Sequence, residues 1–181
     1  MKVLFIGDIV GSPGRAAAKD FLPKIMKENE IDFTVANVEN AAGGFGITPK
    51  ILEELFSYGI DVATSGNHIW DKKEVMQVIN SERRLLRPAN YPQGVAGNGS
   101  GIFTLKENHK IGVLNLEGRV YLPNLDCPFN KGKEEVNKLR KETNIIIVDF
   151  HAEVTSEKIA MGWFLDGEVS AVIGTHTHIQ T

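Results

Sequence analysis

The sequence predicts a layered α/β fold, and three observations support this prediction. Short apolar, β-branched runs are each followed by a glycine or polar turn and then by a longer amphipathic run. Strands that alternate with helices in this way are typical of α/β layers. A hairpin pattern in the middle of the chain favours a mixed sheet, or two packed sheets, over a purely parallel one. Hydrophobic residues at 42% and charged residues at 24% are close to the average of globular proteins.

The first half of the chain predicts strands that each lead into a helical segment. The helix over 13–27 is expected to use Ser12 as its N-cap, with a proline in its first position. The helix over 48–58 repeats this arrangement with Thr48 as N-cap, and a further helix is expected over 71–79. The predicted strands are 2–6, 33–38 and 61–64.

The second half predicts the hairpin and then a return to alternating helices and strands. Segment 91–101 is rich in glycine and proline and predicts a loop. Strands over 101–105 and 110–115 are expected to flank a turn at Glu107, Asn108 and His109. The remaining elements are helices over 131–141 and 156–164 and strands over 144–150 and 169–173.

Length and composition exclude several classes of protein. The 181 residues predict a single domain over 1–181. Twenty Lys and Arg against 23 Asp and Glu give a net charge of −3, which argues against binding to duplex DNA by charge alone. No apolar run reaches the roughly 18 residues that a membrane helix needs. The single cysteine, Cys127, excludes an internal disulfide and indicates a reducing, cytoplasmic compartment.

Polar side chains collect where the predicted strands end, which is where layered α/β folds place their sites. Four of the five histidines belong to this set, and only His109 lies outside it. A lone aspartate after a strand is as often a helix cap as a ligand, so the combination carries the argument. The five strand ends read Gly7-Asp8, Glu39-Asn40, Gly66-Asn67-His68, Asp149-Phe150-His151-Ala152-Glu153 and Gly174-Thr175-His176-Thr177-His178.

The chemistry of this set indicates metal binding. In an extended segment His176 and His178 would point to one side and Thr177 to the other. Imidazole, carboxylate and amide ligands together suit Zn, Fe or Mn better than Mg or Ca. The set is too large for one ion but sufficient for two ions that share a bridging carboxylate. Such pairs of metals recur in enzymes that hydrolyse phosphate esters.

These motifs resemble the YmdB-like subfamily of the calcineurin-like metallophosphoesterase superfamily, and they run in family order from residue 7 to residue 181. The resemblance implies a four-layer sandwich of two mixed sheets with helices outside. It also implies a hydrolase with two divalent or trivalent metal ions, iron first and manganese as the alternative. The implied substrate is a small phosphodiester, namely a 2′,3′-cyclic nucleotide or an RNA end.

Carried over by position, the resemblance implies a role for each site residue. Glu39 would bridge the two metals, and His68 would stand beside the substrate as proton donor. Asn67 would also contact the substrate. The metal ligands would be Asp8, Asn40 and His178 for one ion and Asn67, His151 and His176 for the other.

The glycines between residues 41 and 46 allow two interpretations. Gly43 and Gly44 can present backbone amides to a substrate phosphate. The same segment can equally be a flexible connection into the helix that follows Thr48.

Two departures from the superfamily pattern stand out. Val10 occupies the place where most members have a histidine, a feature that the subfamily shares. The sequence as given also stops three residues after His178, so the second sheet is expected to lack its outer strands and the domain to be short at its C-terminus. An unpaired edge invites pairing with another chain, and thus a homo-oligomer.

Two alternatives to the phosphodiesterase stay open from the sequence. One is a phosphomonoesterase or protein phosphatase on the same pair of metals. The other is a metal-binding regulatory protein with little catalysis. Turnover that depends on His68 would favour an enzyme, whereas metal binding without turnover would favour the regulatory protein.

Overall fold

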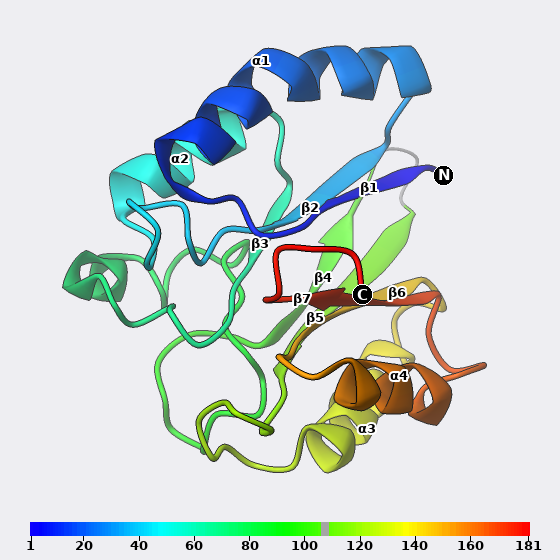
Figure 1. Cartoon of the computed structure of the whole chain (residues 1–181). Coiled ribbons are helices and arrows are strands. Elements are labelled where there is room, and N and C mark those ends of the chain that lie inside the picture. The colour runs from blue at the N-terminus through cyan, green and yellow to red at the C-terminus, as the bar shows by residue number, and fades with distance from the viewer. Residues whose placement is uncertain (106–108) are drawn as a thin grey trace.

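Two β-sheets pack face to face in the computed structural model of this chain, which describes residues 1–105 and 109–181 (Figure 1). The first sheet contains β1 (Val3–Ile6), β2 (Phe33–Asn37) and β3 (Val62–Thr64), all parallel and in that order. The second sheet has the order β4-β5-β6-β7, with β4 antiparallel to β5 and the other neighbours parallel. Its strands are β4 (Ser100–Thr104), β5 (Lys110–Glu117), β6 (Ile146–His151) and β7 (Ala171–Thr175).

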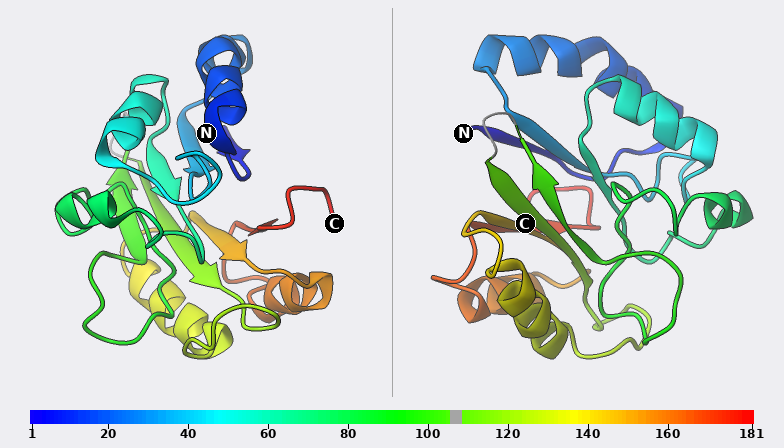
Figure 2. Two further views of the ribbon diagram at one scale, coloured as in Figure 1. Left: turned by 60° about the vertical axis from the view of Figure 1, so that its left-hand side comes forward. Right: turned by 180° about the vertical axis from the view of Figure 1, so that it is seen from behind.

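Helices cover the outer face of each sheet, so the molecule has four layers (Figure 2). The first sheet carries α1 (Gly11–Asn29) and α2 (Pro49–Ser57), and the second carries α3 (Pro128–Leu139) and α4 (Thr155–Phe164). This arrangement confirms the predicted α/β sandwich. The second sheet is mixed as expected, whereas the first consists only of parallel strands in the part of the chain that the structure describes.

Three apolar clusters fill the three spaces between the layers, because successive strand residues point to opposite faces. Val35 of β2 and Ile147 of β6 meet between the two sheets. Their neighbours Ala36 and Val148 instead face the helices of their own sides. The same alternation continues past the apolar part of the strands, so the odd-numbered polar residues near the strand ends face the space between the sheets. They are Asn37, Asn115, Glu117, Asp149 and His151, all fully buried.

The start of α1 differs from the prediction. The helix begins at Gly11 rather than at residue 13, with Val10 in the cap position and no side-chain cap. The amide of Gly11 donates to the carbonyl of Asn40 at 2.9 Å, so a distant loop satisfies the first donor of the helix. The amide of Gly14, which an N-cap at Ser12 could have served, donates to the carbonyl of Val10 at 3.0 Å. The predicted N-cap of α2 is confirmed, because the Thr48 hydroxyl accepts from the amide of Ile51 at 3.4 Å.

Other differences concern element ends. The helix predicted over 71–79 is a 3-10 helix, η1 (Lys73–Gln77). The strand predicted over 169–173 lies two residues later as β7. The hairpin is confirmed by the pairing of Thr104 with Lys110, while Glu107 and Asn108 of its predicted turn lie outside the described residues. Within the described ranges, no helix has the length and apolar character to cross a membrane.

Replacing Thr48 with alanine should lower the free energy of unfolding by about 1 kcal/mol, because α2 loses its N-cap hydrogen bond. Ser12→Ala is the matched control and should change it by less than about 0.5 kcal/mol, since Ser12 is exposed and lies inside α1. Urea unfolding of the three proteins gives both differences. Equal losses from both substitutions would mean that Ser12 caps α1 after all.

Candidate metal centre

The residues predicted for the site come together where the parallel strands of both sheets end. They form two adjoining groups of side chains. The first, here the Asp8 group, consists of Asp8, Asn40 and His178. The second, here the Glu39 group, consists of Glu39, Asn67, His151 and His176.

In the Asp8 group, the side chains of Asp8 and Asn40 face the imidazole of His178. Its Nε2 lies 3.5 Å from Asp8 Oδ1 and 3.3 Å from Asn40 Oδ1. Asn40 is held in this orientation because its Nδ2 donates to the carbonyl of Gly44 at 2.8 Å. The Asp8 side chain is 4% exposed, so its carboxylate is almost fully removed from water.

The Glu39 group converges on Nε2 of His151. This nitrogen lies 3.0 Å from Glu39 Oε1, 3.1 Å from Asn67 Oδ1 and 3.1 Å from His176 Nδ1. One ligand atom from each of Glu39, His151 and His176 lies within 4.8 Å of the other two, which is close enough to hold one metal ion. Gly66 makes this approach possible, because a Cβ at that position would lie 2.1 Å from the His151 ring.

The two groups share a boundary at Asp8. Its Oδ2 accepts from the backbone amide of His176 at 3.1 Å, and its Oδ1 lies 3.9 Å from His151 Nδ1. The structure therefore brings all seven predicted ligand residues into one continuous centre, while their division between two ions stays a prediction.

The charges in the centre are strongly coupled. Burial alone would raise the pKa of Glu39, but the hydrogen bond and charge of His151 and the His68 amide hold it below its usual value. Burial alone would lower the pKa of His151, but Glu39 above all keeps it above its usual value. Burial lowers the pKa of His176. A cation between these groups would therefore take the place of the proton that Glu39 and His151 share.

His151 is oriented by a chain of buried side chains. Thr175 Oγ1 donates to Asp149 Oδ1 at 2.7 Å, so its free lone pair can accept from His151 Nδ1 at 2.9 Å. This places the proton of a neutral ring on Nδ1 and leaves Nε2 free to bind a metal. The sequence motifs place Asp149 beside His151 but do not reveal the hydroxyl between them.

Asn37 is a supporting residue of the centre that the sequence analysis did not single out, because it falls within the strand predicted over 33–38. Its Nδ2 donates to Asp149 Oδ2 at 3.0 Å, and its Oδ1 accepts from the amide of Glu39 at 3.2 Å. One side chain thus connects the support of His151 to the backbone of Glu39. The signal that the sequence offered was a polar amide within a predicted strand of mostly apolar residues. The structure shows that this side chain is fully buried.

His68 lies at the edge of the centre. Its amide donates to Glu39 Oε2 at 3.0 Å, and its Nδ1 lies 2.7 Å from Asp71 Oδ2. The side chain is 27% exposed and packs edge-on against the exposed ring of Phe45. Among residues 1–105 and 109–181 its Nε2 has no hydrogen-bond partner, so this nitrogen can face a substrate.

The glycine loop after Asn40 is a compact turn. The amide of Gly44 donates to the carbonyl of Asn40, and that of Ala42 donates to the carbonyl of Gly46. Gly43 and Gly44 have φ angles of 74° and 99°, which favour glycine. The visible role of this loop is to orient Asn40, and substrate contact by Gly43 and Gly44 stays a prediction.

The segment that carries His176 and His178 is not extended as predicted. The strand ends at Thr175, and a bend follows in which His176 has φ 94° and His178 has φ 56°. The alternation argument is therefore wrong, and the two rings face different groups. His176 Nε2 contacts Glu153 Oε2 at 2.7 Å, so Glu153 supports His176 rather than the neighbouring His151.

Glu117 is a further buried carboxyl group beside the centre. It pairs in register with His151 at the end of β5, and neither of its oxygens has a hydrogen-bond partner within residues 1–105 and 109–181. Burial raises its pKa to about 8, so it holds its proton at neutral pH.

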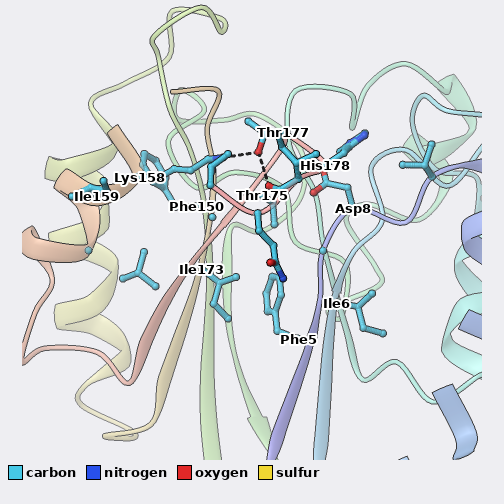
Figure 3. Close-up of a pocket in the computed structure, with 18 residues that line it drawn as sticks. Phe5, Ile6, Asp8, Phe150, Lys158, Ile159, Ile173, Thr175, Thr177 and His178 are labelled. Carbon is cyan, nitrogen blue, oxygen red and sulfur yellow. Dashed lines mark hydrogen bonds and ion pairs between the residues drawn. The ribbon is translucent and has the colours of Figure 1, made fainter. Parts of the chain in front are cut away.

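A cavity of about 1100 Å³ adjoins the Asp8 group between β1 and β7 (Figure 3). These two strands are the free edges of their sheets in the described chain. Asp8, His178 and Lys158 lie at its polar end, and Phe5, Ile173 and Phe150 are among its apolar lining.

The residues present fit bound cations. Asp8 Oδ1 is buried and has no hydrogen-bond partner in the described part of the chain, although it faces the imidazoles of His151 and His178. A buried carboxylate oxygen in that state is costly unless a cation or donor meets it. The donor set of imidazole, carboxylate and amide oxygen is typical of divalent transition metals.

Two facing sheets with this ligand set at their strand ends define an α/β sandwich of the metallophosphoesterase type. The profile of the YmdB-like protein family matches residues 4–181. The chain belongs to the YmdB-like family.

Relatives and solved structures agree with this assignment. The 2′,3′-cyclic-nucleotide 2′-phosphodiesterase of Bacillus subtilis is 51% identical over 182 residues, covering 100% of this chain and 68% of that protein. A putative phosphatase/phosphodiesterase of Mycoplasma genitalium is 40% identical, covering 99% of this chain and 65% of its own length. The chain thus spans about two thirds of these relatives.

Two crystal structures superimpose on the whole chain. A hypothetical protein from Thermus thermophilus matches with a TM-score of 0.93 at 39% identity, over 69% of that chain. A novel phosphatase from Mycoplasma pneumoniae matches with a TM-score of 0.91 at 36% identity, over 66% of that chain.

Thr175→Val should lower the free energy of unfolding by about 1–3 kcal/mol, because Asp149 and His151 both lose a buried partner. Thr34→Val is the matched control. The Thr34 hydroxyl is buried and finds no partner among the described residues, so its removal should be neutral or stabilising. Urea unfolding measures both. A Thr175→Val protein as stable as the Thr34→Val protein would contradict the proposed support of His151.

Glu117→Gln should alter how stability depends on pH in metal-free protein. A raised carboxyl pKa means that the native state binds the proton more tightly than the unfolded state, so wild-type stability should fall as pH rises from 4.5 towards about 8. The glutamine variant lacks this loss, and its stability relative to wild type should increase over the same range. Urea unfolding between pH 4.5 and 8 in a chelator tests this, and a constant difference would contradict it.

Proposed function

We propose that this chain is a two-metal phosphodiesterase that hydrolyses 2′,3′-cyclic nucleotides, free or at an RNA end. The observation that carries the proposal is the presence of two adjoining groups of candidate ligand side chains that meet at Asp8. The name of the Bacillus subtilis relative supports the substrate class. The single Cys127 supports a cytoplasmic location as part of the same proposal.

The ligands would be shared between two ions. Asp8, Asn40 and His178 would hold one, with Glu39 bridging. Asn67, His151 and His176 would hold the other. We propose iron first and manganese as the alternative. When bound, two such ions supply positive charge for the phosphoryl oxygens and lower the pKa of a water molecule so that it attacks near neutral pH.

His68 is the proposed proton donor to the leaving ribose oxygen. When both ring nitrogens of His68 carry a proton, Nδ1 donates to Asp71 and Nε2 holds the proton for the leaving oxygen. Asp71 fixes the ring plane, and the His68 amide bound to Glu39 fixes the distance of the ring from the metal ligands. Asn67 would add its amide to the contacts of the phosphoryl group.

A phosphomonoesterase is the second candidate. The structural relative from Mycoplasma pneumoniae is described as a phosphatase, and the same residues could serve both reactions. Comparing turnover of a 2′,3′-cyclic nucleotide with that of a phosphate monoester separates the two.

His68→Ala should lower turnover of a 2′,3′-cyclic nucleotide by about 10²-fold or more while both metals stay bound. Glu39→Gln, which keeps the size of the side chain, should lose metal as well as activity because it removes the bridging charge. Elemental analysis after anaerobic reconstitution with Fe(II) or Mn(II), combined with steady-state assays, measures both effects.

Two results would contradict these roles. Loss of both metals in His68→Ala would contradict the role of His68 as a proton donor, because the fall in turnover would then follow from the missing metals. A Glu39→Gln protein with two ions and full rate would disprove the bridge. Metal binding by wild type without turnover of any phosphoester would favour the regulatory protein instead.

A further inference from the structure

The segment His176–Thr177–His178 holds its two imidazoles in an unfavourable backbone conformation. Both histidines have positive φ, which is uncommon for any residue other than glycine and costs free energy unless the surroundings enforce it. A ligand segment of this kind needs contacts that hold it before metal binds. On the side facing the centre, the His176 amide donates to Asp8 Oδ2.

Lys158 of α4 contacts the same segment from the opposite side. Its Nζ donates to the Thr177 hydroxyl at 3.1 Å, and that hydroxyl donates in turn to the carbonyl of Ile179 at 3.2 Å (Figure 3). Thr177 lies between the two histidines, so one hydroxyl connects helix α4 to the middle of the strained bend.

The path of the Lys158 side chain is built into β7. It passes over Gly174, where a Cβ would lie 2.7 Å from Lys158 Cδ. Glycine at this position therefore lets the four-carbon chain cross the strand and reach Thr177. Burial lowers the pKa of Lys158, while the charges of Glu153, Asp8 and Asp149 raise it. A partly desolvated ammonium makes a stronger hydrogen bond than one in water.

We propose that Lys158 is a positioning residue for the metal centre, which fixes the His176–Thr177–His178 bend through Thr177 so that both imidazoles face their ligand groups. This inference rests on the proposed two-metal function. The crossing at Gly174, the donor reaching Thr177 and the strain on both sides of that residue all point to the same role.

The decisive experiment measures Mn(II) binding to the metal-free, full 181-residue chain. Lys158→Met keeps the aliphatic path over Gly174 and removes the donor. It should weaken at least one of two Mn(II) sites about 10-fold, the lower end of what loss of a supporting contact does to metal affinity. Loss of the free Mn(II) signal in electron paramagnetic resonance reports binding. Lys24→Met removes the same charge from an exposed position on α1 and should bind like wild type.

Variants at Thr177 test whether Lys158 acts through the Thr177 hydroxyl. Thr177→Val should weaken Mn(II) binding as much as Lys158→Met does. Thr177→Ser should bind Mn(II) like wild type, because serine keeps the hydroxyl. The double variant Lys158→Met/Thr177→Val should bind no more weakly than either single variant, since both break one connection. The melting temperature of the metal-free Lys158→Met protein should match that of Lys24→Met.

Several outcomes would overturn the proposal. Wild-type affinity in Lys158→Met would remove the positioning role, and additive losses in the double variant would separate Lys158 from Thr177. A lower melting temperature with both sites weakened equally would mean that Lys158 only supports the fold. If wild type itself binds fewer than two Mn(II) ions, the proposed function fails and this inference fails with it.

Discussion

The carboxylate of Asp149 is completely buried between the two sheets, and its need for hydrogen-bond donors ties the sheets together. Asn37 and Thr64 of the first sheet donate to one oxygen, and Thr175 of the second sheet donates to the other. Burial nevertheless raises the pKa of Asp149 to about 6, so the donors offset only part of the cost. Side chains from β2, β3, β6 and β7 must therefore keep one relative position.

The metal centre depends on this arrangement. The hydrogen bond to Asp149 orients the Thr175 hydroxyl, and that hydroxyl orients the His151 ring. Asn37, which also binds Asp149, positions the backbone of Glu39. These contacts hold His151 and Glu39 through groups of the protein itself. A preorganised centre binds metal with a smaller entropic penalty than one that must assemble its ligands, because the conformational entropy of the ligands is already lost in folding.

The same constraint explains the electrostatic character of the centre. Acceptor oxygens outnumber donors around His151, and the buried Oδ1 of Asp8 has no hydrogen-bond partner among the described residues. Such an excess of negative charge in a water-poor space is stable only with a proton or a cation in it. Burial raises the pKa of Glu117 to about 8 and so disfavours a further negative charge beside the centre. The buried groups around His151 and Asp8 thus affect both the stability of the fold and the binding of metal.

The sequence by itself determined the order of strands and helices, the N-cap at Thr48 and the polar residues that collect at the strand ends. These features depend on local pattern and on the rule that parallel strands end at one edge. The choice of seven ligands among those polar residues followed from the resemblance to the family. Only the tertiary structure decided that α1 begins at Gly11 and not after Ser12, because the amide of Gly11 finds its partner in Asn40, which is 29 residues away in the sequence. It also decided the bend at His176 and the role of Thr175 as the link between Asp149 and His151. Asn37 contacts Asp149 across 112 residues of sequence, and no local pattern predicts which buried polar groups will meet when two sheets close on each other.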